Sequence, residues 1–456
     1  MLNHEDNDLL TRVGAGTPMG DLLRQYWMPA ALSAELPDSD GAPLRVRLLG
    51  ENLVAFRATS GQVGLVAEAC PHRRASLFYG RNEAEGLRCA YHGWKFDTAG
   101  RCTDLPNEAP DCPLKNKVRL RAYPCRERNG VVWAYLGSRT EPPPLPDLEW
   151  NLRPDNVPFL WRNYRACNWV QAMEGDIDSS HINFLHSTLD SDDLSTVPGV
   201  PLPGYAASGI RLLQESCMPR LEARDTEAGV LHTSARRLDD GREYHRVHPF
   251  LFPFHTMVGG GTSEAEVSFN GKLWMPMDDE HTLILEWQFR PVRVWSDAER
   301  AAMLAARAPH GFLEPTAAPA GAWRPRANAD NDYLLDRTLE KTRLFCGILS
   351  NPLQDAAMQE SMGAIVDRTQ EHLGPADTVI IRMRRRLIKA ARALREQGIV
   401  PPGVDHPELY SVRPVGIILS AGADWVESTR ERREVAHKDK ETELAFNPGS
   451  EFPNPK

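Results

Sequence analysis

The sequence predicts an α+β protein in which a small all-β domain is followed by a larger domain of strands and helices. Three observations predict this class. Residues 44–137 consist of short alternating runs of apolar and polar residues cut by turns, as in an all-β domain. The proline-rich segment 141–146 then marks a stiff linker and a boundary. Beyond it, a second group of expected strands is followed by long stretches with helical periodicity.

Residues 1–40 are expected to be a short helical entry that belongs to the larger domain. Apolar residues recur there at helical spacing, namely Leu9, Leu10 and Val13, then Leu22, Leu23, Tyr26 and Trp27. Residues 41–146 are assigned to the β domain, with strands expected at 45–49, 53–57, 63–67, 93–96, 118–123 and 131–136. Asn129-Gly130 is expected to form a tight hairpin turn.

Residues 147–426 are assigned to the larger domain, and residues 427–456 to a charged tail that is expected to be mobile. Residues 168–186 are expected to be helical. Further strands are expected at 229–237, 244–258, 266–275 and 282–291, and helices at 295–307 and across 332–398. Gly259-Gly260-Gly261 is expected to be a turn at a sheet edge. Arg382–Arg386, the nearest approach to a basic run, is expected to be the exposed face of a helix.

The chain has 456 residues, with 53 Lys and Arg against 62 Asp and Glu, which gives a formal charge of −9. This mildly acidic balance argues against nucleic acid or an anionic membrane as the main partner. No apolar stretch approaches the ~20 residues needed to span a bilayer. Residues 1–6 do not resemble a signal peptide, so a cytoplasmic protein is expected. The eight cysteines are then expected to be reduced unless they bind metal.

Two pairs of metal-binding side chains lie in the β domain, as Cys70-Pro-His72 and Cys89-Ala-Tyr-His92. Two thiolates and two imidazoles suit either a tetrahedral zinc ion or a two-iron cluster. Zinc fingers normally pair Cys with Cys and His with His along the chain. Here each loop provides one of each, as a Rieske [2Fe–2S] centre requires, because one iron takes both cysteines and the other takes both histidines. A zinc ribbon is the alternative.

The residues that flank these pairs strengthen the case. Cys70-Pro-His-Arg-Arg-Ala-Ser-Leu77 and Cys89-Ala-Tyr-His-Gly-Trp-Lys-Phe96 closely resemble the two ligand loops of Rieske proteins. The family pattern commonly has Gly after the first Arg, where this chain has Arg74. That departure concerns the loop surface. The resemblance implies that Cys70, His72, Cys89 and His92 hold the cluster.

A second constellation, Asp178-Ser-Ser-His181-Ile-Asn-Phe-Leu-His186, follows the linker. Two histidines five residues apart at a helix end can turn both imidazoles toward one ion. With one distant carboxylate they form the 2-His-1-carboxylate face that leaves positions open on Fe(II) for O₂. Either histidine alone would more often be a core or helix-cap residue. After a Rieske pair, the segment resembles the iron-binding segment of Rieske non-haem iron ring-hydroxylating oxygenases, and Glu174-Gly-Asp-Ile-Asp-Ser-Ser-His181 is especially similar to the phthalate dioxygenase branch.

This resemblance implies residue roles. His181 and His186 bind the mononuclear iron, and Asp178 bridges the iron site to a Rieske histidine. The segment Gln354-Asp-Ala-Ala-Met-Gln-Glu360 is similar to the family's late helix, whose opening Asp completes the triad, so Asp355 is the expected third ligand. Glu360 and Asp367 are the alternative carboxylates.

The resemblance extends from His4 to about Leu394 and implies the fold, the cofactors and the partners. A Rieske β domain lies beside a catalytic domain with a large antiparallel sheet flanked by helices. The cofactors are a [2Fe–2S] Rieske cluster and mononuclear Fe(II), with NADH acting through a separate flavin and iron–sulfur reductase. Because electrons cross between neighbouring subunits in this family, a homotrimer or a stacked pair of trimers is expected.

The implied function is cis-dihydroxylation of a carboxylated aromatic, such as a phthalate, a chlorobenzoate or a phenoxybenzoate, with O₂. Two alternatives stay open. One is a Rieske monooxygenase that removes an O-methyl group from a methoxybenzoate with the same metals. The other is a non-catalytic Rieske electron carrier whose second metal is structural. The ligands alone identify neither the substrate nor the ring positions attacked.

A carboxylate substrate beside an iron site needs a cation, and arginine offers a planar fork that binds both oxygens. The strands expected after the histidine motif carry Arg220, Arg236, Arg237 and Arg246. Alternation over residues 244–248 places Tyr244, Arg246 and His248 on one face of a strand. Arg246 is therefore the expected anchor, with Arg236 next and the Ser179 hydroxyl as a further contact. A surface or salt-bridged side chain is the alternative for any one of these arginines.

Overall fold

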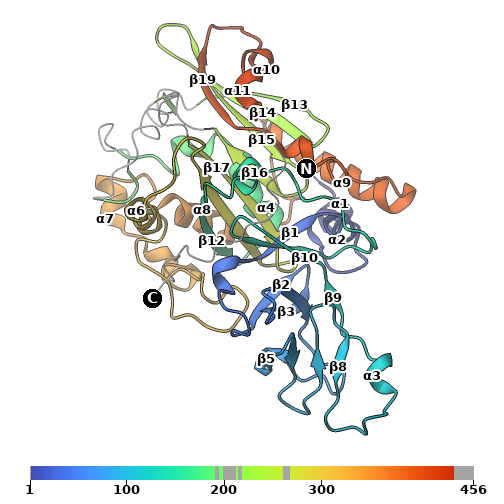
Figure 1. Ribbon diagram of the computed structural model, residues 1–456. Helices are drawn as coiled ribbons and strands as arrows, with labels where there is room; N and C mark the ends of the chain where they lie inside the picture. The colour runs from blue at the N-terminus through green and yellow to red at the C-terminus, as the bar shows by residue number, and fades with distance from the viewer. Residues whose placement is uncertain (1, 190–194, 199–211, 214–217, 260–267, 436–456) are drawn as a thin grey trace.

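The computed structural model describes residues 2–189, 195–198, 212–213, 218–259 and 268–435. Figure 1 shows a small β domain at one end of the molecule and a large sheet with flanking helices in the remainder. Every pairing within the large sheet is antiparallel. The α+β class that the sequence predicts and the large antiparallel sheet that the family resemblance implies are confirmed. Among the helices in the described ranges, none is long and apolar enough to cross a membrane.

The β domain contains two four-stranded sheets, ordered β2-β3-β4-β9 and β5-β6-β7-β8. Their strands are β2 (Leu44–Leu48), β3 (Glu51–Arg57), β4 (Val63–Ala67), β9 (Ala122–Tyr123), β5 (Arg81–Glu83), β6 (Gly86–Arg88), β7 (Lys95–Phe96) and β8 (Cys102–Asp104). The first three strands lie within two residues of their predicted ranges, whereas only the end of 118–123 forms a strand. Cys70 and Cys89 belong to the core of this domain, with Phe56, Leu87 and Phe96. The core therefore fixes both ligand loops.

A separate three-stranded sheet has the order β1 (Trp27–Leu32), β11 (Val131–Tyr135) and β10 (Cys125–Arg128). Helices α1 (His4–Thr11) and α2 (Pro18–Leu23) precede it, so the helical prediction is wrong for Trp27. All six residues of β1 are buried, and the strand pairs with β11. Pairing with a distant strand overrides the local helical spacing. The hairpin turn at Asn129-Gly130 is confirmed, with φ of 45° and 84°.

The large sheet forms the centre of the molecule (Figure 1). Its strands, in spatial order, are β12 (Phe159–Arg165), β18 (Thr282–Phe289), β17 (Phe269–Pro276), β16 (His255–Val258), β15 (Glu243–Leu251), β14 (Gly229–Arg237) and β13 (Arg220–Asp225), and β19 (Val415–Leu419) also pairs with β15. The prediction for 229–237 coincides with β14, whereas the strand predicted over 244–258 divides into β15 and β16. Of the predicted glycine turn, Gly260 and Gly261 lie outside the described residues.

The longer helices of this domain are α4 (Trp169–Ile177), α6 (Asp297–Arg307), α7 (Arg337–Thr342), α8 (Asn351–Ser361) and α9 (Thr378–Gln397). Short turns of helix are α3 (Leu114–Lys117), α10 (Trp425–Ser428), α11 (Arg430–Arg433), η1 (Ser33–Glu35), η2 (Leu77–Tyr79), η3 (Glu149–Asn151), η4 (His181–Asn183), η5 (Ala329–Leu334), η6 (Pro375–Asp377) and η7 (Pro407–Tyr410). The helix predicted over 168–186 ends at Ile177, because Asp178 adopts an extended conformation and bonds the Ser180 amide. The helical stretch predicted over 332–398 is interrupted at Gly347 and Gly363, where φ is positive.

The prediction that Arg382–Arg386 forms an exposed helix face is wrong for Arg384. Only 3% of the Arg384 side chain is exposed, and it donates to Glu174 on α4 (Nε–Oε1 2.6 Å) and to Glu371 (Nη1–Oε2 2.6 Å). Arg368 is also buried, and its Nη2 lies 3.3 Å from Glu174 Oε2. Burial alone would raise the pKa of Glu174, but Arg368 and Arg384 outweigh burial and lower that pKa. This buried ion cluster joins α9 to the helix that precedes the histidine motif.

We expect Arg384→Ala to lower the free energy of unfolding by about 3–5 kcal/mol, because its removal breaks the buried ion pairs with Glu174 and Glu371 and leaves Glu174 to Arg368 at 3.3 Å. Arg385→Ala is the matched control. Arg385 is the next residue on α9 and is exposed, so we expect a change within about 0.5 kcal/mol. Chemical unfolding of both variants measures the difference. Equal midpoints for the two would contradict a stabilising role for the buried cluster.

Candidate metal centres

Two histidines and one aspartate from distant parts of the chain converge beside α4. His181 begins η4, His186 follows it, and Asp355 lies in α8. The two Nε2 atoms are 3.2 Å apart, and Asp355 Oδ1 lies 3.1 Å from His186 Nε2 and 3.9 Å from His181 Nε2. All three ligand atoms lie within 4.8 Å of one another. One ion could contact all three, and this donor set suits an Fe(II) site with open positions.

The alternative carboxylates do not enter this cluster. Glu360 accepts hydrogen bonds from the Ala166 amide at 3.0 Å and the Tyr333 hydroxyl at 2.5 Å, and Asp367 is exposed and bonds Thr369. Burial alone would raise the pKa of Asp355, but His186 and then His181 hold that pKa well below its usual range. Asp355 is therefore the carboxylate available to an ion held by the two histidines.

Asp178 orients His181 from the side opposite the cluster. Its Oδ2 lies 3.1 Å from His181 Nδ1, and its Oδ1 accepts from the Ser180 amide at 2.7 Å and the Ser180 hydroxyl at 2.5 Å. Burial alone would raise the pKa of Asp178, but the hydrogen bond with His181 outweighs burial and lowers it. An ionised Asp178 accepts a hydrogen bond from Nδ1–H of His181, which keeps the proton on Nδ1 and leaves Nε2 free as a ligand atom.

The two Cys-x-His and Cys-x-x-His loops have matching backbone geometry. In the first, the Cys70 amide bonds the Ala75 carbonyl; in the second, the Cys89 amide bonds the Trp94 carbonyl. The rings of His72 and His92 approach to 4.5 Å between centroids, and Trp94 stacks on His72 at 4.3 Å. Burial, with Cys89 close by, raises the pKa of Cys70 to about 11. His72 Nδ1 is buried and has no hydrogen-bond partner among the described residues, as expected for an atom meant for a metal.

The spacing of these four donors distinguishes the two metal centres proposed from the sequence. Ligand atoms around one tetrahedral zinc lie roughly 3.3–3.8 Å apart, given the usual metal–ligand distances. Within the described residues, no three of Cys70, His72, Cys89 and His92 bring their ligand atoms within 4.8 Å of one another. The four donors therefore do not surround a single ion, and a cluster with two irons accounts for the wider spacing.

The backbone shows the energetic consequence of the one departure from the usual loop sequence. Arg74 has φ of 65°, and Gly93 at the corresponding place in the second loop has φ of 77°. Both amides close the loop, onto the Cys70 carbonyl and the Cys89 carbonyl. A left-handed conformation favours Gly and costs about 1–2 kcal/mol for other residues. Arg74 therefore adopts a strained conformation without displacing either ligand of its loop.

One face of the large sheet carries a row of polar side chains, of which Ser234, Arg246 and Thr256 are buried and Lys272 is half-buried. Cross-strand register places Ser234 opposite Arg246, and Thr256 opposite Lys272. Asp176 of α4 accepts from Lys272 Nζ at 2.5 Å and from the Thr256 hydroxyl. Helix α4, which leads into the histidine motif, therefore packs over this face. Lys272 was not among the residues predicted from the sequence, although a lone lysine among apolar strand residues was the available signal.

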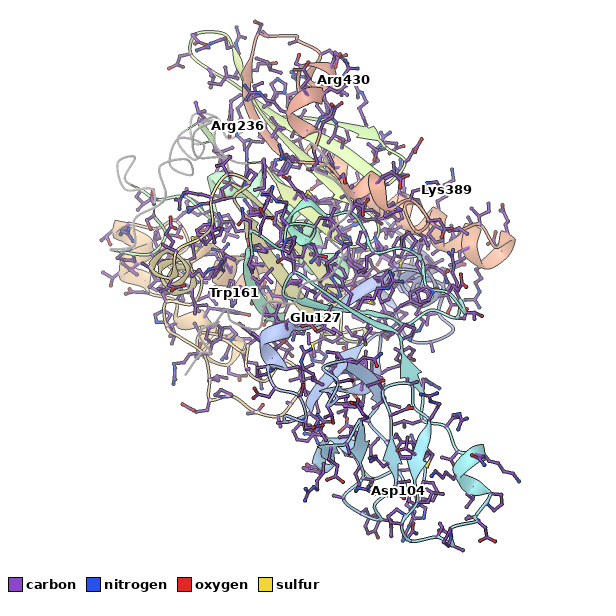
Figure 2. The ribbon with its side chains drawn as sticks, in the orientation of Figure 1. Asp104, Glu127, Trp161, Arg236, Lys389 and Arg430 are labelled. Carbon is purple, nitrogen blue, oxygen red and sulfur yellow. The ribbon has the colours of Figure 1, made fainter. Side chains whose placement is uncertain are left out.

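Of the candidate arginines, Arg236 and Arg246 are buried on this face, whereas Arg220 and Arg237 are exposed. Arg236 lies on β14 (Figure 2) and donates to the Ser179 carbonyl at 2.8 Å and to Asn183 Oδ1 at 3.1 Å, so it supports the histidine segment. Arg246 Nε donates to the Gly259 carbonyl at 2.8 Å, and its buried Nη1 has no hydrogen-bond partner within the described part of the chain. Ser179 is also buried.

Tyr244 and His248 are buried on the same strand as Arg246, as the predicted alternation requires. His248 stacks on His232 of the neighbouring strand at 5.1 Å between centroids, a pair that the sequence analysis missed. Burial lowers the pKa of both histidines, that of His232 to about 3. The wall beside Arg246 is therefore made of neutral imidazoles, and the arginine carries its positive charge.

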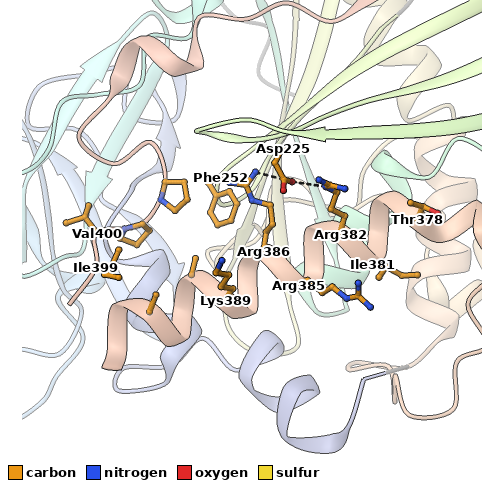
Figure 3. Close-up of a pocket in the computed structure, with 14 residues that line it drawn as sticks. Asp225, Phe252, Thr378, Ile381, Arg382, Arg385, Arg386, Lys389, Ile399 and Val400 are labelled. Carbon is orange, nitrogen blue, oxygen red and sulfur yellow. Dashed lines mark hydrogen bonds and ion pairs between the residues drawn. The ribbon is translucent and has the colours of Figure 1, made fainter. Parts of the chain in front are cut away.

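A groove of about 880 Å³ lies along α9, and none of the candidate ligand residues lines it. Figure 3 shows Asp225 between Arg382 and Arg386, at 2.7 Å and 3.4 Å from their nitrogens. Apolar residues, among them Phe252 and Ile399, form the rest of the wall. This groove is separate from both groups of candidate metal ligands.

Comparisons with known proteins place these features in context. A model described as "Rieske [2Fe-2S] domain" matches residues 26–124, and one described as "LigXa C-terminal domain like" matches residues 134–446. The chain is 39% identical over 444 residues to the 3-chlorobenzoate-3,4-dioxygenase oxygenase subunit of Comamonas testosteroni, covering 94% of this chain and 98% of the relative. It is 34% identical over 431 residues to the phthalate 4,5-dioxygenase oxygenase subunit of Pseudomonas putida, covering 93% and 94%. The solved structure of the NdmA QL mutant with theobromine, from Pseudomonas putida CBB5, has the same fold, with a TM-score of 0.57 at 20% identity over 89% of this chain and 99% of that one.

Proposed function

The chain belongs to the Rieske non-haem iron oxygenases, as the oxygenase subunit of a phthalate dioxygenase-like enzyme, and from that premise we propose that it cis-dihydroxylates a carboxylated aromatic ring. The observation that supports this most directly is the convergence of His181, His186 and Asp355 beside a sheet face that carries the buried cation Arg246. The two relatives are named for chlorobenzoate and phthalate, which are both aromatic carboxylates.

The protein uses a Rieske [2Fe–2S] cluster and mononuclear iron, and it takes electrons from a separate NADH-dependent reductase. We assign one cluster iron to Cys70 and Cys89 and the other to His72 and His92. We assign the mononuclear iron to His181, His186 and Asp355. When bound, the cluster supplies electrons one at a time and the mononuclear iron activates O₂ beside the ring. The chain itself contributes binding, orientation and a dry site.

Asp178 is proposed to connect the two centres. One of its oxygens faces His181, and 22% of its side chain is exposed, so the carboxylate can also accept a hydrogen bond from outside the chain. The β domain lies at one end of the molecule (Figure 1), and Tyr91, next to His92, is 56% exposed. We therefore place the Rieske histidine of a neighbouring subunit on Asp178, in a head-to-tail homotrimer that is single or stacked in pairs.

We propose a division into an entry segment at 1–40, a Rieske domain at 41–146, a catalytic domain at 147–426 and a tail at 427–456. The entry segment holds α1, α2 and the strand β1, and the tail begins within α10 and includes α11. Because the reductase draws on NADH, we place the protein in the cytoplasm. A non-catalytic electron carrier with a structural second metal is disfavoured, because such a metal site would need no buried cation such as Arg246 on the neighbouring sheet face.

Arg246 is the proposed anchor of the substrate carboxylate. Its guanidinium is buried, and its only hydrogen bond within the described residues is from Nε to the Gly259 carbonyl. A buried charge without an anionic partner is costly, and a carboxylate would supply that partner. Lys272 on the same face is already paired with Asp176, and Arg236 is engaged by the histidine segment. Arg246 is therefore the cation best placed to bind a substrate, and Ser179 is a proposed additional contact.

We expect Arg246→Ala to raise the apparent KM for a benzoate-type substrate roughly 100-fold, because a lost bidentate pair is worth a few kcal/mol of binding. Iron content and the Rieske spectrum should stay unchanged. Arg237→Ala, at an exposed position on the neighbouring strand, is the control and should leave the KM within about twofold. An unchanged KM for Arg246→Ala would remove this residue from the pocket, and Arg236 would be tested next.

The proposed reaction itself is tested by turnover of benzoates, phthalates and methoxybenzoates with NADH and a phthalate-type reductase. Product mass separates the possibilities. Gain of two oxygen and two hydrogen atoms supports dihydroxylation of the ring. Release of formaldehyde from a methoxybenzoate would instead support O-demethylation with the same metals. Reduction of the cluster without consumption of any ring substrate would favour the electron carrier.

A further inference from the structure

Gln354 precedes the proposed iron ligand Asp355 on α8 and contacts a different ligand of the same cluster. Its side chain is fully buried. The side-chain Oε1 lies 2.7 Å from His186 Nδ1, and Nε2 donates to the Ile348 carbonyl, also at 2.7 Å. Both polar atoms of the amide therefore have a hydrogen-bond partner, and Oε1 faces the Nδ1 atom of the His186 imidazole.

The second contact decides which way the amide points. The Ile348 carbonyl can only accept a hydrogen bond, so the atom that faces it must be the Nε2 donor. The atom that faces His186 is then the Oε1 acceptor, which requires a proton on His186 Nδ1. In a neutral imidazole with Nδ1 protonated, Nε2 carries the free lone pair. That Nε2 atom is the one that lies 3.1 Å from Asp355 Oδ1 and 3.2 Å from His181 Nε2.

The two histidines are thus oriented by different chemical groups. His181 Nδ1 faces the carboxylate of Asp178, whereas His186 Nδ1 faces a neutral amide. A neutral group can hold the imidazole without adding negative charge to a buried site that already contains Asp355. Asp178 follows α4 and Gln354 belongs to α8, so each ligand histidine is held by a separate element.

We propose that Gln354 is a positioning residue that selects the tautomer and the ring orientation of His186, so that Nε2 binds the metal. This inference rests on the proposed iron site. It gives α8 two roles through consecutive residues, because Asp355 supplies a ligand atom and Gln354 orients another. A side chain that accepts a hydrogen bond from the nitrogen of a metal-binding histidine that does not contact the metal commonly contributes 10–100-fold to metal affinity.

The test measures Co(II) binding to protein that retains its Rieske cluster but has been stripped of mononuclear iron. Gln354→Met keeps the length of the side chain and removes the acceptor. Gln354→Glu keeps an acceptor oxygen toward His186 but loses the donor to the Ile348 carbonyl. We expect Gln354→Met to weaken Co(II) binding about 10–100-fold and to alter the Co(II) absorption bands. Gln354→Glu should bind within about threefold of wild type or more tightly. Met358→Ala, at an exposed position on the same helix, is the control and should bind as wild type.

Two results would overturn the inference. Gln354→Met could bind Co(II) as tightly as wild type, or Gln354→Met and Gln354→Glu could be weakened equally, which would mean that the bond to Ile348 is what matters. Should Gln354→Met lower the unfolding midpoint, Gln354→Asn, whose amide is too short to reach His186, replaces it in the same comparison. Failure of the proposed iron site has a different signature, because stripped wild-type protein would then bind no stoichiometric Co(II) or would bind it equally well after Asp355→Ala.

Discussion

Asp355→Ala is expected to abolish oxygenation, by roughly a thousandfold or more, while leaving the Rieske spectrum unchanged. The substitution removes the carboxylate whose Oδ1 lies 3.1 Å from His186 Nε2. A metal ion contributes several kcal/mol to such reactions, and each 1.4 kcal/mol is a factor of ten in rate. Two histidines alone are a weak site for Fe(II). Iron analysis should therefore find the two cluster irons and no third.

Three measurements make this expectation specific. His181→Ala and His186→Ala should give the same loss of mononuclear iron and turnover with the cluster intact. Asp367→Ala, which removes an exposed carboxylate outside the ligand cluster, should retain both iron and rate. Cys70→Ser and His92→Ala should have the opposite signature and lose the brown-red colour of the cluster. If Asp355→Ala kept near-normal iron content and rate, the third ligand would have to be sought at Glu360 or Asp367.

Asp178→Asn is expected to retain both metal centres yet slow turnover roughly 100-fold or more. Asp178 Oδ1 accepts hydrogen bonds from Ser180, and its Oδ2 accepts one from His181 Nδ1. An asparagine has only one acceptor oxygen, so it must give up one of these partners or present its amino group to a protonated His181 Nδ1. It also cannot accept a further hydrogen bond from a Rieske histidine. Rapid-mixing measurement of cluster oxidation, with substrate and O₂ present, tests electron delivery directly.

Ser180→Ala is the matched variant for this measurement. It removes the hydroxyl bond to Asp178 but keeps the backbone bond and the contact with His181, so we expect a much smaller loss of rate. Mixed oligomers of Asp178→Asn chains and His92→Ala chains should recover part of the activity if electrons cross between subunits. Absence of any recovery would favour transfer within one chain and contradict the head-to-tail arrangement.

The sequence by itself determined the features that depend on residues close together in the chain. The two ligand loops are recognisable because each one brings a cysteine and a histidine within four residues. Strand β14 coincides with its prediction, since its residues and the turns that bound it are consecutive. The hairpin at Asn129-Gly130 was predictable because two adjacent residues that tolerate positive φ specify its turn.

Other features were decided by contacts between distant segments. The spacing of residues could not choose Asp355 over Glu360 or Asp367, and only a resemblance selected it. The packing of α8 against α4 brings Asp355 to the histidines and turns Glu360 toward Tyr333. In the same way, β1 extends as a strand because β11 pairs with it, although its first residue, Trp27, continues a helical spacing.

The buried arginines show most clearly the difference between what the sequence determines and what the tertiary structure decides. Arg384 and Arg385 are adjacent arginines on one helix, yet one lies in an ion cluster with Glu174 and the other faces solvent. Strand alternation ranked Arg246 before Arg236 in the sequence, but only the sheet register and the histidine segment give the two arginines different partners. Gln354 had no distinguishing pattern at all. Local patterns report periodicity and turn chemistry, whereas the partner of a buried polar group depends on which distant segments pack against it, and that information exists only in the folded chain.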